Sequence, residues 1–176
     1  MRKRMILGWV LIAVFATVHA IWAVRADDKD RKSKNGKVEG AAGGAQVTLD
    51  YGRPNVGGRK IWGALVPFGQ VWRAGADEAT TIAFDKNVLV DGKPVPAGRY
   101  ALFLEPKDAS MWTVIFNKVA DQWGAFKYDA KSDALRIEVL SGPHAATETL
   151  EYVIDGGRVE MHWADLAVGF SVKAAD

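Results

Sequence analysis

Residues 150–163 read Leu-Glu-Tyr-Val-Ile-Asp-Gly-Gly-Arg-Val-Glu-Met-His-Trp, and this stretch decides the fold class. On each side of Gly156-Gly157, from Leu150 to Ile154 and from Val159 to Trp163, apolar residues occupy every second position. A period of two places these side chains on one face of a β-strand. Glycine accepts the positive φ that a tight hairpin turn needs. The stretch therefore predicts two antiparallel strands joined by a turn.

The same pattern of short apolar segments and turns extends in both directions from this hairpin. Such regular spacing is typical of sandwiches and barrels. We therefore predict that residues 46–176 form an all-β domain, an antiparallel β-sandwich of jelly-roll-like type. Short helices are expected only at 120–123 and near Asp165. The further strands are expected at 47–51, 80–84, 88–90, 93–95, 99–105, 112–116, 135–139 and 167–172.

The N-terminus carries a hydrophobic segment, Met5–Val24, which contains no charged residue and follows the basic triplet Arg2-Lys3-Arg4. This arrangement is typical of a secretory signal, with Val24 and Ala26 placed for cleavage before Asp27. A helix of this length would also cross the hydrocarbon core of a bilayer, which is about 30 Å thick. Residues 1–26 are therefore predicted to be a signal peptide or a membrane-anchor helix.

Export is the predicted destination, either to the periplasm or to the inner membrane with the domain facing the periplasm. Six basic residues between positions 25 and 37 follow the hydrophobic segment, against three before it. By count alone, these downstream basic residues would favour an orientation with the domain on the cytoplasmic side. We give more weight to the short basic N-terminus before a single hydrophobic segment. Residues 27–45 are charged and then rich in glycine, and are predicted to be a flexible linker.

Composition excludes several kinds of chemistry. The chain has no cysteine, so disulfides, thiolate metal ligands and cysteine nucleophiles are ruled out. Its net charge of +2 becomes −2 when the four basic residues before position 27 are removed. A domain so close to neutral has no broad attraction for nucleic acid. No glycine-rich phosphate loop precedes a helix, and we expect neither a cofactor nor a metal.

The segment 51–81 differs from the predicted strands because it is long, irregular and rich in arginine, tryptophan and glycine. Long loops in compact domains are commonly functional. Its motifs, and others further along, closely resemble the exported bacterial family called domain of unknown function 2911. The motifs are Tyr51-x-Arg53-Pro54, Gly58-Arg59-Lys60-Ile61-Trp62-Gly63, Leu65-Val66-Pro67, Gly69-Gln70-Val71-Trp72-Arg73-x-Gly75-Ala76, Glu78-Ala79-Thr80, Gly92-Lys93, Pro96-Ala97-Gly98-x-Tyr100-x-Leu102-Phe103, Trp112-x-Val114, Asn117 and Gln122-Trp123-Gly124.

The resemblance covers about Gln46 to Lys173 and implies an exported β-rich domain without an established activity. It supplies no catalytic residues to carry over. One departure is Asp77, where the family is expected to have asparagine, so this position carries a carboxylate in place of a neutral amide.

The chemistry of these residues favours a non-catalytic binding module for a sugar, a peptide or an organic anion of the cell envelope. Tryptophan rings can stack on flat groups, and arginine can bind a carboxylate or phosphate through two hydrogen bonds. In the alternative interpretation of the same residues, the tryptophans anchor the loop and the arginines pair with its two acids. The candidate ligand-binding residues are Arg53, Arg59, Lys60, Trp62, Trp72, Arg73, Asp77, Glu78 and Trp123.

Two other classes of function stay open. An envelope hydrolase or isomerase would need a histidine or an acid in a cleft, and the domain contains only His144 and His162, the latter two residues after Glu160. Asp77 and Glu78 are adjacent, so on an extended backbone they point in opposite directions and cannot act as a carboxylate pair. A structural or protein-interaction domain tethered to the inner membrane through residues 5–24 would also fit the sequence.

Overall fold

The structure is a computed structural model that describes Arg25 and residues 29–175. The predicted leader helix over Met5–Val24 lies outside the described residues. Within the described part of the chain, no helix has the length and apolar character needed to cross a membrane.

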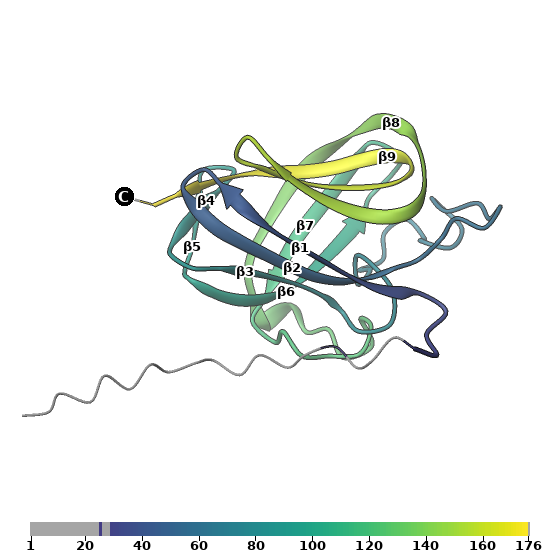
Figure 1. Cartoon of the computed structure of the whole chain (residues 1–176), viewed down its shortest axis with the longest axis horizontal. Coiled ribbons are helices and arrows are strands. Elements are labelled where there is room, and N and C mark those ends of the chain that lie inside the picture. The colour runs from purple at the N-terminus through teal and green to yellow at the C-terminus, as the bar shows by residue number, and fades with distance from the viewer. Residues whose placement is uncertain (1–24, 26–28, 176) are drawn as a thin grey trace, which may run out of the picture.

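The described residues fold into one antiparallel sheet of nine strands, with a single short 3-10 helix. The strand order across the sheet is β1-β2-β3-β6-β7-β8-β9-β4-β5 (Figure 1). The prediction of an all-β antiparallel domain is confirmed. The elements are β1 (Lys34–Ala42), β2 (Ala45–Arg53), β3 (Thr80–Phe84), β4 (Val88–Val90), β5 (Lys93–Val95), β6 (Gly98–Pro106), β7 (Met111–Asn117), η1 (Ala130–Ser132), β8 (Asp133–Asp155) and β9 (Arg158–Ala174).

The β8–β9 hairpin forms as the alternating pattern predicts. Ile154 pairs with Val159 next to the turn, and Gly156 and Gly157 have φ values of 52° and 87°. The first part of β8 pairs with β7 and the rest pairs with β9, and the register shifts twice beyond Pro143. Such irregularities bend a strand and increase its twist. As a result the sheet curls until β1 lies against β8.

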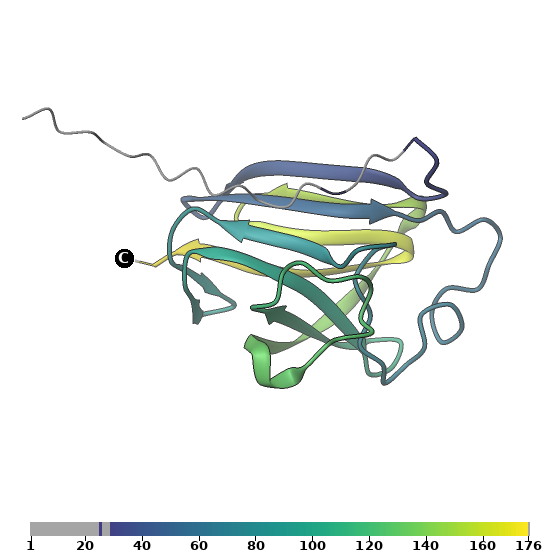
Figure 2. The same cartoon turned by 90° about the horizontal axis from the view of Figure 1, so that it is seen from below.

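The nine strands follow one another in a single hydrogen-bonded series rather than in two separate sheets. The finer description as a jelly-roll-like sandwich therefore stays a prediction. The buried side chains of almost all strands meet in one main core, in which Trp112 is 0% exposed and Trp163 is 1% exposed. The connection between β2 and β3, residues 54–79, projects beyond one end of the strands (Figure 2).

The predicted flexible linker over 27–45 is wrong for its second half, because residues 34–42 form strand β1. β1 pairs with β2 along its whole length, and Ala42 is completely buried. Its glycines serve close packing: a Cβ on Gly36 would lie 2.7 Å from the ring of Tyr51, and a Cβ on Gly40 would lie 3.3 Å from Ile154. Their function is therefore to admit neighbouring side chains rather than to provide flexibility.

The short helix expected near Asp165 is also wrong, since that residue lies within β9. The long β8 holds this segment as a strand through backbone pairing, for example between Pro143 and Leu166. Residues 120–123 form no helix either. The backbone of this region pairs instead with the β2–β3 connection, where Ala79 N donates to Gln122 O at 3.0 Å.

Candidate functional site

The projecting connection between β2 and β3 is anchored to the core by its two tryptophans. The ring of Trp62 meets those of Trp112 and Trp163 edge to face, at centroid distances of 5.1 and 5.7 Å. Trp72 stacks on Trp163 at 5.7 Å. The indole nitrogen of Trp62 donates to Asp165 Oδ1 at 3.0 Å. Edge-to-face and stacked aromatic pairs stabilise beyond their buried area, so these tryptophans have a structural role.

A cleft of about 900 Å³ opens between this connection and the neighbouring segments. Four of the residues predicted from the sequence line it together: Arg59, Trp72, Arg73 and Asp77. Lys32, from the segment before β1, adds a third cationic side chain. Along the described lining, Asp77 is the one carboxylate, so the wall of the cleft is positively charged.

The two arginines of the cleft contact backbone carbonyls rather than acids. Arg73 Nε donates to Gly75 O at 3.4 Å, while Arg59 Nε donates to Val56 O at 2.9 Å and its Nη2 donates to Asn55 O. No carboxylate among the described residues lies within 4.0 Å of either guanidinium group. Both arginines therefore line the cleft without a carboxylate counter-ion among the described residues.

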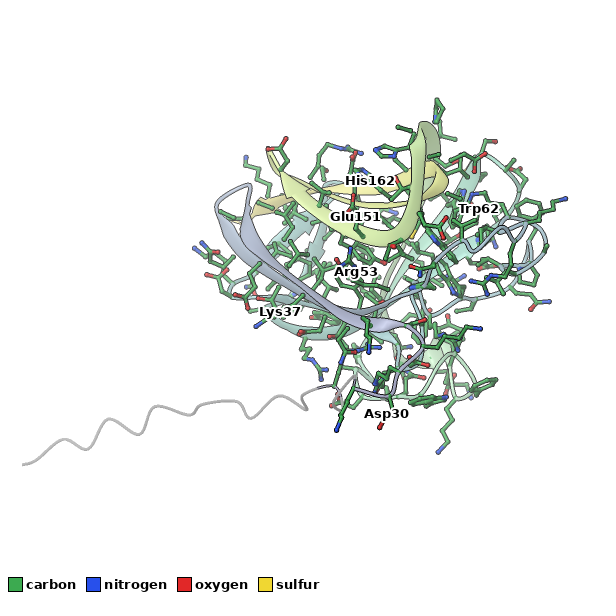
Figure 3. All side chains as sticks on the ribbon, turned by 45° about the vertical axis from the view of Figure 1, so that its right-hand side comes forward. Asp30, Lys37, Arg53, Trp62, Glu151 and His162 are labelled. Atoms are coloured by element: carbon green, nitrogen blue, oxygen red, sulfur yellow. The ribbon has the colours of Figure 1, made fainter. Side chains whose placement is uncertain are left out.

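Other predicted residues lie outside the cleft. Arg53 Nε donates to Leu150 O at 3.3 Å, which places its side chain beside β8, near Glu151 (Figure 3). Lys60 and Trp62 line a second hollow, of about 480 Å³, which Arg59 lines as well. Trp123 lines a third, of about 270 Å³, together with Glu78. The predicted set is therefore divided among separate surfaces.

Glu78 is held by two arginines that the sequence did not indicate as its partners. Arg31 binds both carboxylate oxygens, at 2.6 and 2.5 Å, and Arg25 Nη2 lies 3.0 Å from Oε2. The hydrogen bonds from Arg31 lower the pKa of Glu78 from 4.5 to about 2, with Arg25 contributing in the same direction. The interpretation that loop arginines pair with the two acids is therefore wrong, because the partners come from the N-terminal side of β1.

Asp77 adopts a backbone conformation that few residues favour. Its φ is 63°, a region that aspartate and asparagine tolerate better than most side chains. Its carboxylate lies 3.4 Å from Arg31 Nη1. The local backbone therefore favours an aspartate or an asparagine at this position.

The histidines meet at a different part of the molecule, at the β8–β9 hairpin. The rings of His144 and His162 stack with centroids 3.9 Å apart, and His162 Nε2 lies 3.2 Å from Glu160 Oε2. Neither histidine lines the cleft. Across the residues that the structure describes, no group of three histidine, cysteine or acidic side chains could hold a metal ion.

These observations define the class of protein: a single antiparallel β domain with a cationic cleft beneath a tryptophan-anchored loop. The family model described as "Protein of unknown function (DUF2911)" matches residues 33–172, and the chain belongs to this family. The match begins at residue 33, before Gln46, and so includes all of β1. No curated protein and no solved structure matches the chain.

Proposed function

We propose that the domain is a non-catalytic binding module that takes a carboxylate-bearing ligand of the cell envelope in the cleft. The observation that carries the proposal is the pair Arg59 and Arg73, which line a cleft of about 900 Å³ with no carboxylate partner in the described part of the chain. A guanidinium group binds a carboxylate through short, charge-assisted hydrogen bonds. Such bonds contribute about 1.5–3 kcal/mol each.

The rest of the lining supports a ligand with an apolar or ring-shaped body. Trp72 and Phe126 line the same cleft as the arginines, and aromatic faces pack on sugar rings and apolar side chains. An acidic sugar of an envelope polymer and the C-terminus of a peptide both combine a carboxylate with such a body.

Chemistry at the acids of this region has less support. With a pKa of about 2, Glu78 stays ionised and paired at neutral pH, which is unfavourable for a general acid or base. The hydrolase or isomerase therefore stays the weaker alternative. A tethered interaction domain stays a further alternative, with no observation that favours it over ligand binding.

Isothermal titration calorimetry with glucuronic acid and with the dipeptide Ala-Ala tests the proposal, since each probe carries one carboxylate. Arg73→Ala should weaken binding of the preferred probe by about 10- to 100-fold, the loss expected for one charge-assisted contact. Arg158→Ala is the matched control, because Arg158 pairs with Glu160 at 3.0 Å on β9 and does not line the cleft. Equal binding by Arg73→Ala, or no binding of either probe to the wild-type protein, would refute the proposal.

We also propose that the domain works outside the cytoplasm. The support is the uncharged segment Met5–Val24 after three basic residues. A fusion of a reporter phosphatase, which is active only after export, to the C-terminus of the full chain should be active. An inactive phosphatase fusion, with an active cytoplasmic reporter in its place, would overturn this location.

A further inference from the structure

Arg25, the residue that directly follows the hydrophobic segment Met5–Val24, is docked on the domain. Its side chain is 8% exposed and lies 3.0 Å from Glu78 Oε2. It donates to Ala76 O at 2.8 Å and to Asn35 Oδ1 at 3.1 Å. With a carboxylate, a backbone carbonyl and a side-chain amide as acceptors, the guanidinium group is held in a defined position. Arg25 is therefore a fixed point of the domain, directly after the hydrophobic segment in the sequence.

The loop beside Arg25, residues 118–128, exposes large apolar side chains. Val119 is 49% exposed, Trp123 is 56% exposed and Phe126 is 83% exposed. Trp123 lines the same hollow as Arg25. Of the described residues, Phe126 is the large hydrophobic side chain with the greatest exposure.

The loop is attached to the segment that holds Arg25. Ala79 N donates to Gln122 O and Gly124 N donates to Asp77 O, both at 3.0 Å. Glu78 and Trp123 form an isolated antiparallel bridge between these two contacts. The exposed apolar side chains and Arg25 are thus part of one connected unit. Their relative position does not depend on a flexible linker.

The chemistry of the loop matches the surface of a bilayer. Tryptophan and phenylalanine are favourable at the membrane interface, where an apolar ring contacts acyl chains and polar groups reach water. Three exposed lysines, Lys118, Lys127 and Lys131, outnumber the two exposed acids of this stretch, Asp121 and Asp129. Lysines near a membrane surface are attracted to anionic lipids. Burial of these rings in the apolar part of the interface would be favourable.

We propose that residues 118–128 rest in the interfacial layer of the bilayer that holds Met5–Val24, with Arg25 as the fixed joint between anchor and domain. Ala125 and Phe126 also line the cationic cleft, so the cleft opens beside the membrane. The proposal goes beyond ligand binding and does not depend on it.

Site-directed spin labelling of the full chain in proteoliposomes tests the proposal. The chain has no cysteine, so a nitroxide can be attached at one introduced position. Phe126→Cys probes the loop. Leu140→Cys is the matched control, because Leu140 is also apolar and 69% exposed, but pairs with Met111 at the end of β7 opposite to the loop.

The label at 126 should lose collisions with a water-soluble nickel chelate and gain collisions with oxygen, which concentrates in the bilayer. The label at 140 should stay open to the chelate. Equal chelate access at the two positions, whether both are open or both protected, would overturn the proposal.

The role of Arg25 has its own test in the same sample. Arg25→Gln should return chelate access to the label at 126, whereas Lys37→Gln, at an exposed lysine of β1, should not. Circular dichroism of each variant confirms that the β fold is kept. If the label at 126 stays equally protected in Arg25→Gln, Arg25 is not the joint.

Discussion

Replacing Glu78 by glutamine removes a carboxylate that two arginines bind while keeping the size of the side chain. The pKa of Glu78 falls from 4.5 to about 2 in the folded protein, mainly because Arg31 donates to both of its oxygens. One pKa unit corresponds to about 1.4 kcal/mol, so this lowering is linked to a stabilisation of about 3 kcal/mol. The side chain is 25% exposed, and partial access of solvent reduces this figure to about 2 kcal/mol.

The pH dependence follows from the direction of the shift. A carboxyl group whose pKa is lowered on folding stabilises the protein above its unfolded pKa, and this stabilisation is lost as the pH falls through the folded value. Wild-type protein should therefore exceed Glu78→Gln in free energy of unfolding at pH 7. The difference should shrink between pH 4.5 and about 2, the two pKa values of Glu78.

Urea unfolding of the full chain in nonionic detergent, followed by tryptophan fluorescence, measures this difference. Glu39→Gln is the matched control, because Glu39 pairs with Lys37 at 2.5 Å but both side chains are 57% exposed. An exposed pair contributes about 0–1 kcal/mol. The reasoning is refuted if Glu78→Gln costs no more than Glu39→Gln at pH 7, or if its cost is unchanged in acid.

Substitutions at Gly52, Asp77 and Trp112 test the packing of the domain. Gly52→Ala would place a Cβ 2.3 Å from Ala76 O and should lower the free energy of unfolding by about 1–3 kcal/mol, whereas Gly142→Ala, with nothing within 4 Å, should leave the melting temperature nearly unchanged in calorimetry. Asp77→Asn should be nearly neutral in urea unfolding, while Asp77→Val should cost about 1–2 kcal/mol, because the φ of 63° suits valine poorly. Trp112→Ala should cost about 3–5 kcal/mol, because Trp112 is fully buried, and should remove much of the near-ultraviolet circular dichroism; an unchanged spectrum would contradict its place in the core.

The strands with clear alternation could be predicted from the sequence because their pattern is local. The segments before and after Gly156-Gly157 form β8 and β9 at that turn, and the motifs of the β2–β3 connection identify the family. β1 was missed because Gly36 and Gly40 hide its alternation. The two glycines leave room for Tyr51 and Ile154, whose side chains are distant in the sequence.

The candidate site, too, could be predicted from the sequence only in part. The motif indicated Arg59, Trp72, Arg73 and Asp77, and the fold brings these four to one cleft. The motif did not show that Trp62 belongs to the core cluster or that Arg53 turns toward β8. Whether an aromatic or cationic side chain faces a ligand or a neighbouring strand depends on which strand lies opposite.

By itself, the sequence determined the all-β class, the absence of disulfides, the hydrophobic N-terminal segment and the family. Only the tertiary structure decided that Arg25 and Arg31 hold Glu78, across 53 and 47 positions of the chain. Periodicity reports the burial of neighbouring residues, because it follows from the geometry of one strand. Ion pairs between distant segments depend on how the whole sheet curls. A local sequence pattern contains no information about that curl.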